Sequence, residues 1–266
     1  MLEPQSDSIG EVVSPPEAEA IAASAYIFGF PLVLFERVHA AVAKPTANIP
    51  GADDRPPSVF CLDLGQTTFV LRISDLPLEI RDAWSNVIAS FGRAGPTGDA
   101  PRAIALIRRG WRGPAPAAPE RLSVPTDLVF VIAPGSANPL VPALAGVSPA
   151  SLASAIEQVS RMGAGTFLSR LARLMRHNPP AADDDPLLAR LRRIGIAPGE
   201  PTRLACLPGD LKRALVSGVA AGRAAMADRA RTAPRKEAPG RCDYSGRALW
   251  ASTSLLGIAS GQLGFS

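Results

Sequence analysis

Residues 59–73 read VFCLDLGQTTFVLRI, which is two short apolar or β-branched runs on either side of the turn signal Gly65-Gln66. Runs of the same kind occupy residues 103–107 and 128–133, and segments rich in glycine and proline separate them. Short apolar runs between turn residues are typical of strands in a β-sandwich or a small barrel. We therefore expect a β-rich middle, in which residues 78–88 could form either strand or helix.

A helix is predicted ahead of this middle. Ser14-Pro15-Pro16-Glu17 has the pattern of a helix start, with Ser14 as the cap, proline in the first turn and Glu17 closing a capping box. Proline removes a hydrogen-bond donor and clashes with the preceding turn. We therefore expect a kink or break at Gly29 and Pro31, after which residues 32–43 continue as helix.

The C-terminal part predicts a cluster of helices, because apolar side chains recur there every three or four residues between capping residues and glycines. The expected helices start at Ser148, after 163–165, at Asp185, at Asp210 and at Asp243. The predicted fold class is thus α+β, a β-sandwich or barrel between an N-terminal helix and a C-terminal helical cluster. The predicted division is a flexible leader (1–13), a lead helix with the β domain (14–147) and a helical domain (148–266).

The composition excludes several classes of protein. Of the 266 residues, 47% are hydrophobic and 20% are charged, which is typical of a folded globular chain. The three cysteines show no CxxC spacing and there are two histidines, so neither a disulfide framework nor a zinc centre is indicated. The motifs of nucleotide-binding loops, HExxH metalloproteases and GxSxG hydrolases are absent from the sequence. We expect no cofactor and no metal.

The charge pattern bears on partners and location. The net charge is +4, but the arginines are scattered at helical spacing without interleaved aromatic residues, so no nucleic-acid partner is expected. The first cation is Arg37, which does not fit a secretory signal. The uncharged run 20–35 is shorter than the roughly 20 residues of a membrane span and contains Gly29 and Pro31. We expect a cytoplasmic protein without membrane contact.

Two further groups have structural interpretations. Cys61 lies in an apolar run and is expected to be a buried thiol rather than a nucleophile. The acidic triplet Asp183-Asp184-Asp185 fits no cation-binding loop spacing, and we expect it to be a solvated cap before Pro186.

Six segments, taken in order, resemble one bacterial family, the domain of unknown function 1254. They are Ala25-Tyr26-Ile27-Phe28-Gly29-Phe30-Pro31, Leu62-Asp63-Leu64, Asp82-Ala83-Trp84-Ser85-Asn86-Val87, Gly110-Trp111-Arg112-Gly113 with Pro125-Thr126-Asp127-Leu128, Ile194-Gly195-Ile196-Ala197-Pro198-Gly199, and Asp243-Tyr244-Ser245-Gly246-Arg247. The resemblance implies an immunoglobulin-like β-sandwich with associated helices. It also implies a second, jelly-roll-like domain, catalogued as unknown function 1214, which would begin about where this chain ends.

The chain departs from the family pattern at polar positions. Pro56–Phe60 replaces a usual Asn-Asp-Thr-Leu-Tyr stretch, Leu76–Ile80 lacks a usual Arg-Tyr-Tyr segment, and Pro134 stands where an arginine is usual. These replacements put inherited catalysis in doubt, so whether the protein is an enzyme stays open.

Of the polar residues that remain in the matching segments, which also include Asp127 and Tyr244, six are the candidate ligand-binding residues, with no catalytic role assigned. They are Asp63, Asp82, Trp84, Asn86, Asp243 and Arg247. Each also has a structural interpretation. Asp82 and Asn86 could cap a turn beside a buried Trp84, and Asp243 could cap a helix in which Arg247 is its partner four residues on.

Three functions follow as hypotheses. The first is a non-catalytic binding or accessory protein, which acts through self-association or with a partner that supplies a jelly-roll domain. The alternative is a small-molecule hydrolase or lyase that uses carboxylates such as Asp63 and Asp82 in a cleft between sandwich and helices. The third is binding of the basic C-terminal half to an anionic surface.

Overall fold

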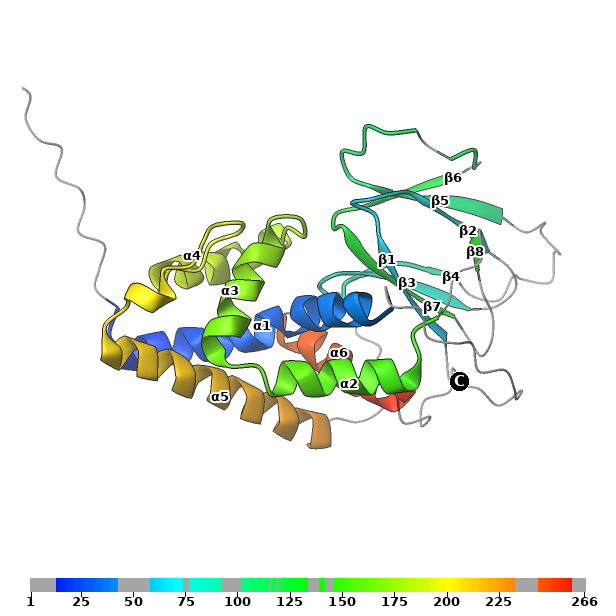
Figure 1. The fold of residues 1–266 in the computed structure, drawn as a ribbon. Helices are drawn as coiled ribbons and strands as arrows, with labels where there is room; N and C mark the ends of the chain where they lie inside the picture. Colours follow the sequence, from blue (N-terminus) through cyan, green and yellow to red (C-terminus); the bar gives the residue numbers. More distant parts are fainter. Residues whose placement is uncertain are drawn as a thin grey trace, which may run out of the picture.

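The computed structural model describes residues 13–42, 58–73, 77–91, 102–114, 116–118, 120–133, 139–141, 146–232 and 244–259. It shows a mixed α+β protein with an N-terminal helix, two β-sheets and C-terminal helices. In Figure 1 the helices gather on one side of the molecule and the two sheets lie on the other. The predicted α+β class is therefore confirmed, whereas the immunoglobulin-like type of the sandwich stays a prediction.

Helix α1 (Pro15–Val42) runs through the middle of the helical half (Figure 1). Its predicted start is confirmed, since the backbone N–H of Glu17 donates to Ser14 Oγ at 3.4 Å. Of the predicted kink or break at Gly29 and Pro31, the break is wrong, because the helix continues without interruption. Proline in a helix interior costs about 3 kcal/mol, but each buried leucine or phenylalanine stabilises by roughly 1.5–3 kcal/mol, and α1 buries many.

Two glycines of α5 (Gly209–Thr232) let this helix approach α1 closely. A Cβ on Gly218 would lie 2.2 Å from the carbonyl oxygen of Glu19, and one on Gly222 would lie 2.6 Å from that of Ala23. Because both obstacles are backbone atoms, they cannot move aside as a flexible side chain would. The α1–α5 contact therefore requires glycine at both positions.

Four strands form the first sheet, in the order β1 (Ser58–Asp63), β7 (Leu128–Ala133), β3 (Leu78–Asp82) and β4 (Val87–Phe91). All neighbours in this sheet are antiparallel. The ambiguous stretch 78–88 is thus resolved as β3, a turn and the start of β4. Asp63 pairs with Leu128 on one side of β7, and Asp82 pairs with Val129 on its other side, so both acids lie at the same end of this sheet.

The second sheet has the order β6 (Glu120–Val124), β5 (Arg102–Arg108), β2 (Phe69–Ile73) and β8 (Leu140–Val141). Its strands are antiparallel except for the parallel pair β5–β6. The predicted strands at 103–107 and 67–73 are confirmed as β5 and β2. Strands β6 and β8 were not predicted.

Side-chain alternation places the first sheet between the helices and the second sheet. On β1, Val59 and Cys61 belong to the core shared with α1, whereas Phe60 and Leu62 belong to the core shared with the second sheet. Strand β7 is buried on both faces in the same alternating way. A strand buried on both faces reads as a continuous apolar run, which explains the sequence of residues 128–133.

The remaining helices surround α1. They are α2 (Pro149–Ser160), α3 (Ala164–Met175), α4 (Asp185–Arg193) and α6 (Tyr244–Ala259), with short 3-10 turns η1 (Ala182–Asp184) and η2 (Leu204–Cys206). The predicted helix starts at Ser148, after 163–165, at Asp185 and near Asp210 are confirmed, whereas Asp243 lies outside the described residues. Helix α1 contacts these helices as well as β1, and the predicted domain boundary at residue 147 stays a prediction.

One described helix, over Pro15–Ala41, is long and apolar enough to cross a membrane by length and composition, with a mean hydropathy of 1.7. Within this fold 72% of its apolar window is buried. The core helix of a water-soluble protein passes the same test, so its hydropathy alone assigns no membrane location.

Candidate functional site at the joint between sheet and helices

The turn between β3 and β4 is organised by a single carboxylate. Asp82 Oδ1 accepts the backbone N–H groups of Trp84 and Asn86, both at 2.9 Å, and its Oδ2 accepts the Asn86 side-chain amide at 2.9 Å. Ser85 has a φ of 66°, in the left-handed region that serine seldom adopts. The three hydrogen bonds to Asp82 hold this turn in shape, and the shape directs Trp84 away from the sheet.

Trp84 inserts into the helical core. Its ring stacks on Phe28 of α1 with centroids 4.5 Å apart, and the side chain is 1% exposed. The indole N–H lies 3.1 Å from the carbonyl oxygen of Asn178 and 3.2 Å from that of Pro179, in the link between α3 and α4. Trp84 therefore joins the sheet to both α1 and this link.

We call this contact between the β3–β4 turn and the helices the joint. Asn178 takes part in it from the helical side. Its Oδ1 accepts the backbone N–H of Leu128 at 3.0 Å, and its Nδ2 donates to the carbonyl oxygen of Leu174 at 3.1 Å. Thr126 adds a hydroxyl that accepts from the N–H of Ala83 at 3.2 Å. These side chains are buried and hydrogen-bonded, so they fix the end of β7 against the helices.

Arg247 on α6 closes the joint. Its Nη1 donates to Asn86 Oδ1 at 3.3 Å and its Nη2 to Asp184 Oδ1 at 2.5 Å, and the residue is only 5% exposed. The prediction that Asp183–Asp185 is a solvated cap is wrong for Asp184, which is buried and paired. The reason is tertiary, because α6 brings a buried guanidinium that needs a carboxylate partner.

A second arginine lies under the same turn. Arg81 donates from Nη1 to the carbonyl oxygen of Ser85 at 2.6 Å and from Nε to Glu79 at 2.5 Å. Its guanidinium stacks 3.6 Å from the ring centroid of Trp250 on α6. Three carboxylates (Glu79, Asp82, Asp184) thus face two guanidiniums (Arg81, Arg247), which leaves the joint with one negative charge in surplus.

Asp184, one of the three carboxylates of the joint, lines a pocket. Asp184 Oδ2 is buried and has no hydrogen-bond partner among the described residues. The pocket has a volume of about 200 Å³, and its lining includes Asp184 together with Asp183, Leu187, Arg190 and Tyr244. An unpaired carboxylate oxygen in a low-dielectric site favours a hydrogen-bond donor or a cation.

The pKa of Asp82 is raised above its ordinary value by burial, which outweighs the opposing hydrogen bonds from Asn86 and Trp84 and the nearby charge of Arg247. Burial disfavours the charged form of a carboxyl group. The joint therefore tolerates the ionised Asp82 only because its hydrogen bonds and Arg247 stabilise it.

A second polar group lies on the other side of β7. Asp127 Oδ1 forms an ion pair with Arg108 Nε at 2.5 Å, and Asp127 Oδ2 lies 3.6 Å from Nδ1 of the exposed His177. Asp63 accepts the backbone N–H of Gly65 at 2.9 Å. Burial raises the pKa of Asp127, Arg108 and His177 counteract it, and the charge of Asp63 raises it further.

The structure brings together four of the six candidate residues, namely Asp82, Trp84, Asn86 and Arg247. Asp63 lies across β7 with Asp127, at a Cα separation from Asp82 of roughly 10 Å by strand spacing. Asp243 lies outside the described residues. Sequence reasoning did not choose Thr126, Asn178 and Asp184 as site residues. Thr126 had a signal in its matching family segment and Asp184 in the acidic triplet, whereas Asn178 had none. Whether these residues bind a ligand stays a prediction.

The described part of the chain contains two free thiols, Cys61 and Cys206. Cys61 is buried as predicted, its Sγ lies 3.9 Å from the carbonyl oxygen of Phe35, and burial together with the charge of Asp63 raises its pKa well above the ordinary value. Cys206 is exposed, and Cys242 lies outside the described residues. Among the described residues no three His, Cys, Asp or Glu side chains are grouped to hold a metal ion.

Comparisons with known proteins agree with this architecture. Residues 38–137 match the family described as protein of unknown function (DUF1254), which confirms the resemblance inferred from the motifs. The fold is similar to the crystal structure of the VPA0106 protein from Vibrio parahaemolyticus, with a TM-score of 0.57 and 17% sequence identity over 91% of this chain and 67% of that chain. This likeness concerns the fold alone. No curated protein matches the sequence.

Proposed function

We propose, from the DUF1254 match over residues 38–137 and the geometry of the joint, that the protein is a non-catalytic binding protein. Its ligand site is the pocket beside Asp184, and the ligand is a small molecule that carries an amine. The observation on which the proposal rests is Asp184, a residue that lines a pocket and whose buried Oδ2 has no hydrogen-bond partner among the described residues.

The carboxylates of the joint support binding rather than catalysis. A general acid or base must be free to exchange a proton with a substrate. Asp82 instead uses both oxygens on its own turn, and Asp63 holds the N–H of Gly65. The two acids on which the enzyme hypothesis depended are thus engaged in turns on opposite sides of β7.

The pocket indicates the ligand chemistry. Its lining combines two carboxylates, Asp183 and Asp184, and one guanidinium, Arg190, with Tyr244 and an apolar wall from Leu187, so one negative charge is in surplus. A protonated amine has donors for the unpaired oxygen. A volume of about 200 Å³ is below the range of roughly 300–1,000 Å³ for pockets of drug-sized ligands, so the amine group belongs to a small molecule.

The test is a titration of the isotope-labelled full chain with methylammonium chloride, followed by amide NMR against sodium chloride at equal ionic strength. We expect shifts confined to residues around the pocket, such as Leu187 and Tyr244, that Asp184→Asn abolishes. Asp185→Asn is the matched control, because Asp185 is exposed, adjacent and carries the same charge. Shifts that persist in a folded Asp184→Asn protein would refute the proposed site.

The accessory part of the proposal concerns assembly. About a third of the VPA0106 chain has no counterpart in this one, which supports a search for a partner that supplies a jelly-roll domain, or for self-association across the immunoglobulin-like sandwich. We propose that this assembly forms in the cytoplasm of a bacterium. Native mass spectrometry of the particle isolated from its source tests it, and a monomer without a partner would contradict it.

One observation favours the alternative, a hydrolase or lyase. Asp127 forms an ion pair with Arg108 and lies 3.6 Å from the exposed His177, and burial raises the pKa of Asp127. A carboxylate and an imidazole therefore lie together at one end of the first sheet, near Asp63. Hydrolysis of p-nitrophenyl acetate by the full chain, compared with His177→Gln, tests this. A rate above that of free imidazole that His177→Gln removes would favour the enzyme.

A further inference from the structure

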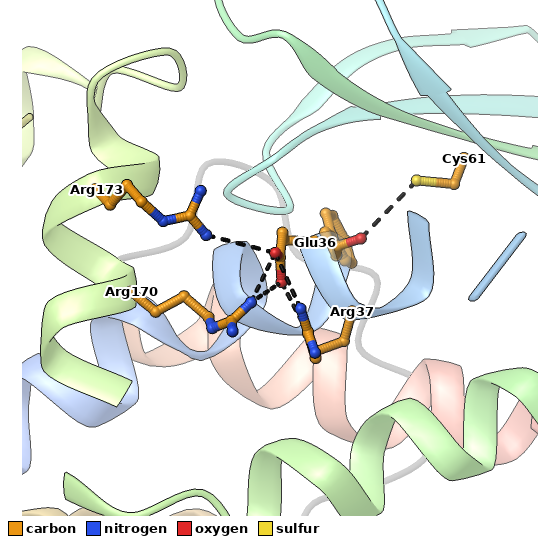
Figure 2. Close-up of polar contacts among 6 residues, drawn as sticks. Glu36, Arg37, Cys61, Arg170 and Arg173 are labelled. Atoms are coloured by element: carbon orange, nitrogen blue, oxygen red, sulfur yellow. Dashed lines mark hydrogen bonds and ion pairs between the residues drawn. The ribbon is translucent and has the colours of Figure 1, made fainter. Parts of the chain in front are cut away.

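A second group of charges lies between α1 and α3, apart from the joint. Figure 2 shows the side chains of Arg37 from α1 and of Arg170 and Arg173 from α3 converging on Glu36. We call these four residues the arginine cluster. It contains three guanidiniums and one carboxylate, so it has two positive charges in surplus.

The arginines differ in how firmly they are held. Arg170 Nη1 lies 2.7 Å from both oxygens of Glu36, and Arg37 donates to it from Nε at 2.8 Å and from Nη2 at 3.1 Å. Arg173 reaches Glu36 only at 3.5 Å, and its side chain is 63% exposed. Arg173 therefore has donors free for another acceptor.

Glu36 cannot satisfy the donors around it. Each guanidinium has five N–H groups, whereas one carboxylate offers about four lone-pair sites. Within the described part of the chain Arg170 Nε is buried and has no hydrogen-bond partner, and the Arg170 side chain is only 22% exposed. Partly buried guanidinium N–H groups that lack an acceptor destabilise the folded state, and an anion that accepts from them would recover this free energy.

The pKa of Glu36 also supports a surplus of positive charge in the arginine cluster. Burial would raise its pKa, but the hydrogen bonds and charges of Arg37 and Arg170 outweigh burial and hold the pKa below the ordinary value. The carboxylate thus stays ionised and still leaves the surplus uncompensated.

We propose that the arginine cluster is an oxyanion-binding site whose ligand carries a phosphate group. A phosphate group carries about −1.5 to −2 charges at neutral pH, which balances the surplus of two. Its oxygens also accept the forked donors of guanidiniums in pairs, which a halide cannot do. Arg173 is the exposed arm of this site, and Arg170 and Arg37 are its inner wall.

This site differs from the pocket beside Asp184 in both place and ligand charge. It is formed by α1 and α3, whereas the pocket is lined by residues of η1, α4 and α6. Failure of one proposal therefore leaves the other intact.

The experiment measures thermal unfolding of the full chain with inorganic phosphate, with acetate and with chloride at equal ionic strength. A ligand that binds the folded state raises the midpoint temperature, and the rise grows with the ratio of the free ligand concentration to Kd. We expect phosphate to raise it above chloride, and acetate to raise it less. In Arg173→Gln the apparent phosphate affinity should fall about tenfold, as for loss of one charge-assisted hydrogen bond.

Arg161→Gln is the matched control, because it removes the same charge from a side chain that is 80% exposed and pairs with Glu157. It should keep the full phosphate response. Arg170→Gln is the second variant and should abolish the response if it folds by circular dichroism. An apparent phosphate affinity that is unchanged in Arg173→Gln, or a response that acetate or chloride matches, would overturn the proposal.

Discussion

The joint and the arginine cluster are built from the same side chains in opposite proportions. At the joint, three carboxylates meet two guanidiniums, and one oxygen of Asp184 is left without a donor. In the cluster, three guanidiniums meet Glu36, and Arg170 Nε is left without an acceptor. In each place the unpaired atom has the sign of the surplus charge. The comparison indicates that the charge of a suitable ligand follows from the numbers of carboxylates and guanidiniums in each group, and not from the presence of an ion pair.

The largest expected effect on stability comes from removing the guanidinium of Arg247 from the joint. Arg247→Met leaves Asp184 and Asp82 buried without their cation, and breaking a buried pair in this way costs about 3–5 kcal/mol. Urea unfolding at neutral pH measures the loss. Arg231→Met is the control, since Arg231 is 73% exposed and pairs with Asp228 on the surface.

The double variant Arg247→Met/Asp184→Leu sharpens this test. If the pair is the unit of stability, the double variant should be more stable than Arg247→Met, because no charge at position 184 stays buried alone. An equal or greater loss in the double variant would show that Arg247 acts mainly through Asn86.

A smaller loss is expected from the apolar side of the joint. Trp84→Phe keeps an aromatic ring against Phe28 but removes the N–H that reaches the carbonyl oxygens of Asn178 and Pro179. We expect a loss of about 1–3 kcal/mol in the free energy of unfolding. Trp111→Phe is the comparison, because the indole N–H of Trp111 bonds only the local carbonyl of Pro114, at an exposed site. If both variants lost the same stability, the joint would not depend on the indole.

The smallest effects should appear as opposite dependences on pH. The pKa of Glu36 is lowered on folding, so its contribution to stability is complete above its ordinary value of 4.5 and is lost as the pH falls through the folded pKa. The pKa of Asp82 is raised, so its contribution is complete below its ordinary value of 3.8 and is lost as the pH rises through the folded pKa.

Unfolding curves of Glu36→Gln and Asp82→Asn over about pH 3 to 6 would compare the two groups. The stability difference between the wild type and Glu36→Gln should shrink as the pH falls. For Asp82→Asn the difference should grow as the pH falls, because the protonated acid of the wild type is then fully stabilising. The same direction in both variants would contradict the assigned electrostatics.

Local signals predicted most of the helices and strands, although not β6 and β8, but they did not predict the joint. The capping residue Ser14 and the apolar run 128–133 predicted a helix start and a strand from neighbouring residues alone. Strand β8 is two residues long, too short to give a periodic pattern. The predicted break at Pro31 was wrong because packing of α1 on every side outweighs a local penalty.

The site was predictable only where a motif kept its members together. Asp82, Trp84 and Asn86 lie in one turn, and their contacts with one another follow from spacing. Asp184 and Asn178 reach the same place through the link between α3 and α4, and that link is set by how the helices pack. A pairing such as Arg247 with Asp184 depends on tertiary structure, so no pattern within either segment indicates it.

The glycine contact between α1 and α5 has a consequence for synthesis of the chain. Helix α1 is made first, yet the helix that covers it so closely ends at Thr232. At translation rates of about 5–20 residues per second, the apolar helix waits on the order of ten seconds or more for its partner. During that interval its hydrophobic face is available to chaperones or to other nascent chains. The ribosome must therefore deliver the chain as far as Thr232 before α5 can close over α1.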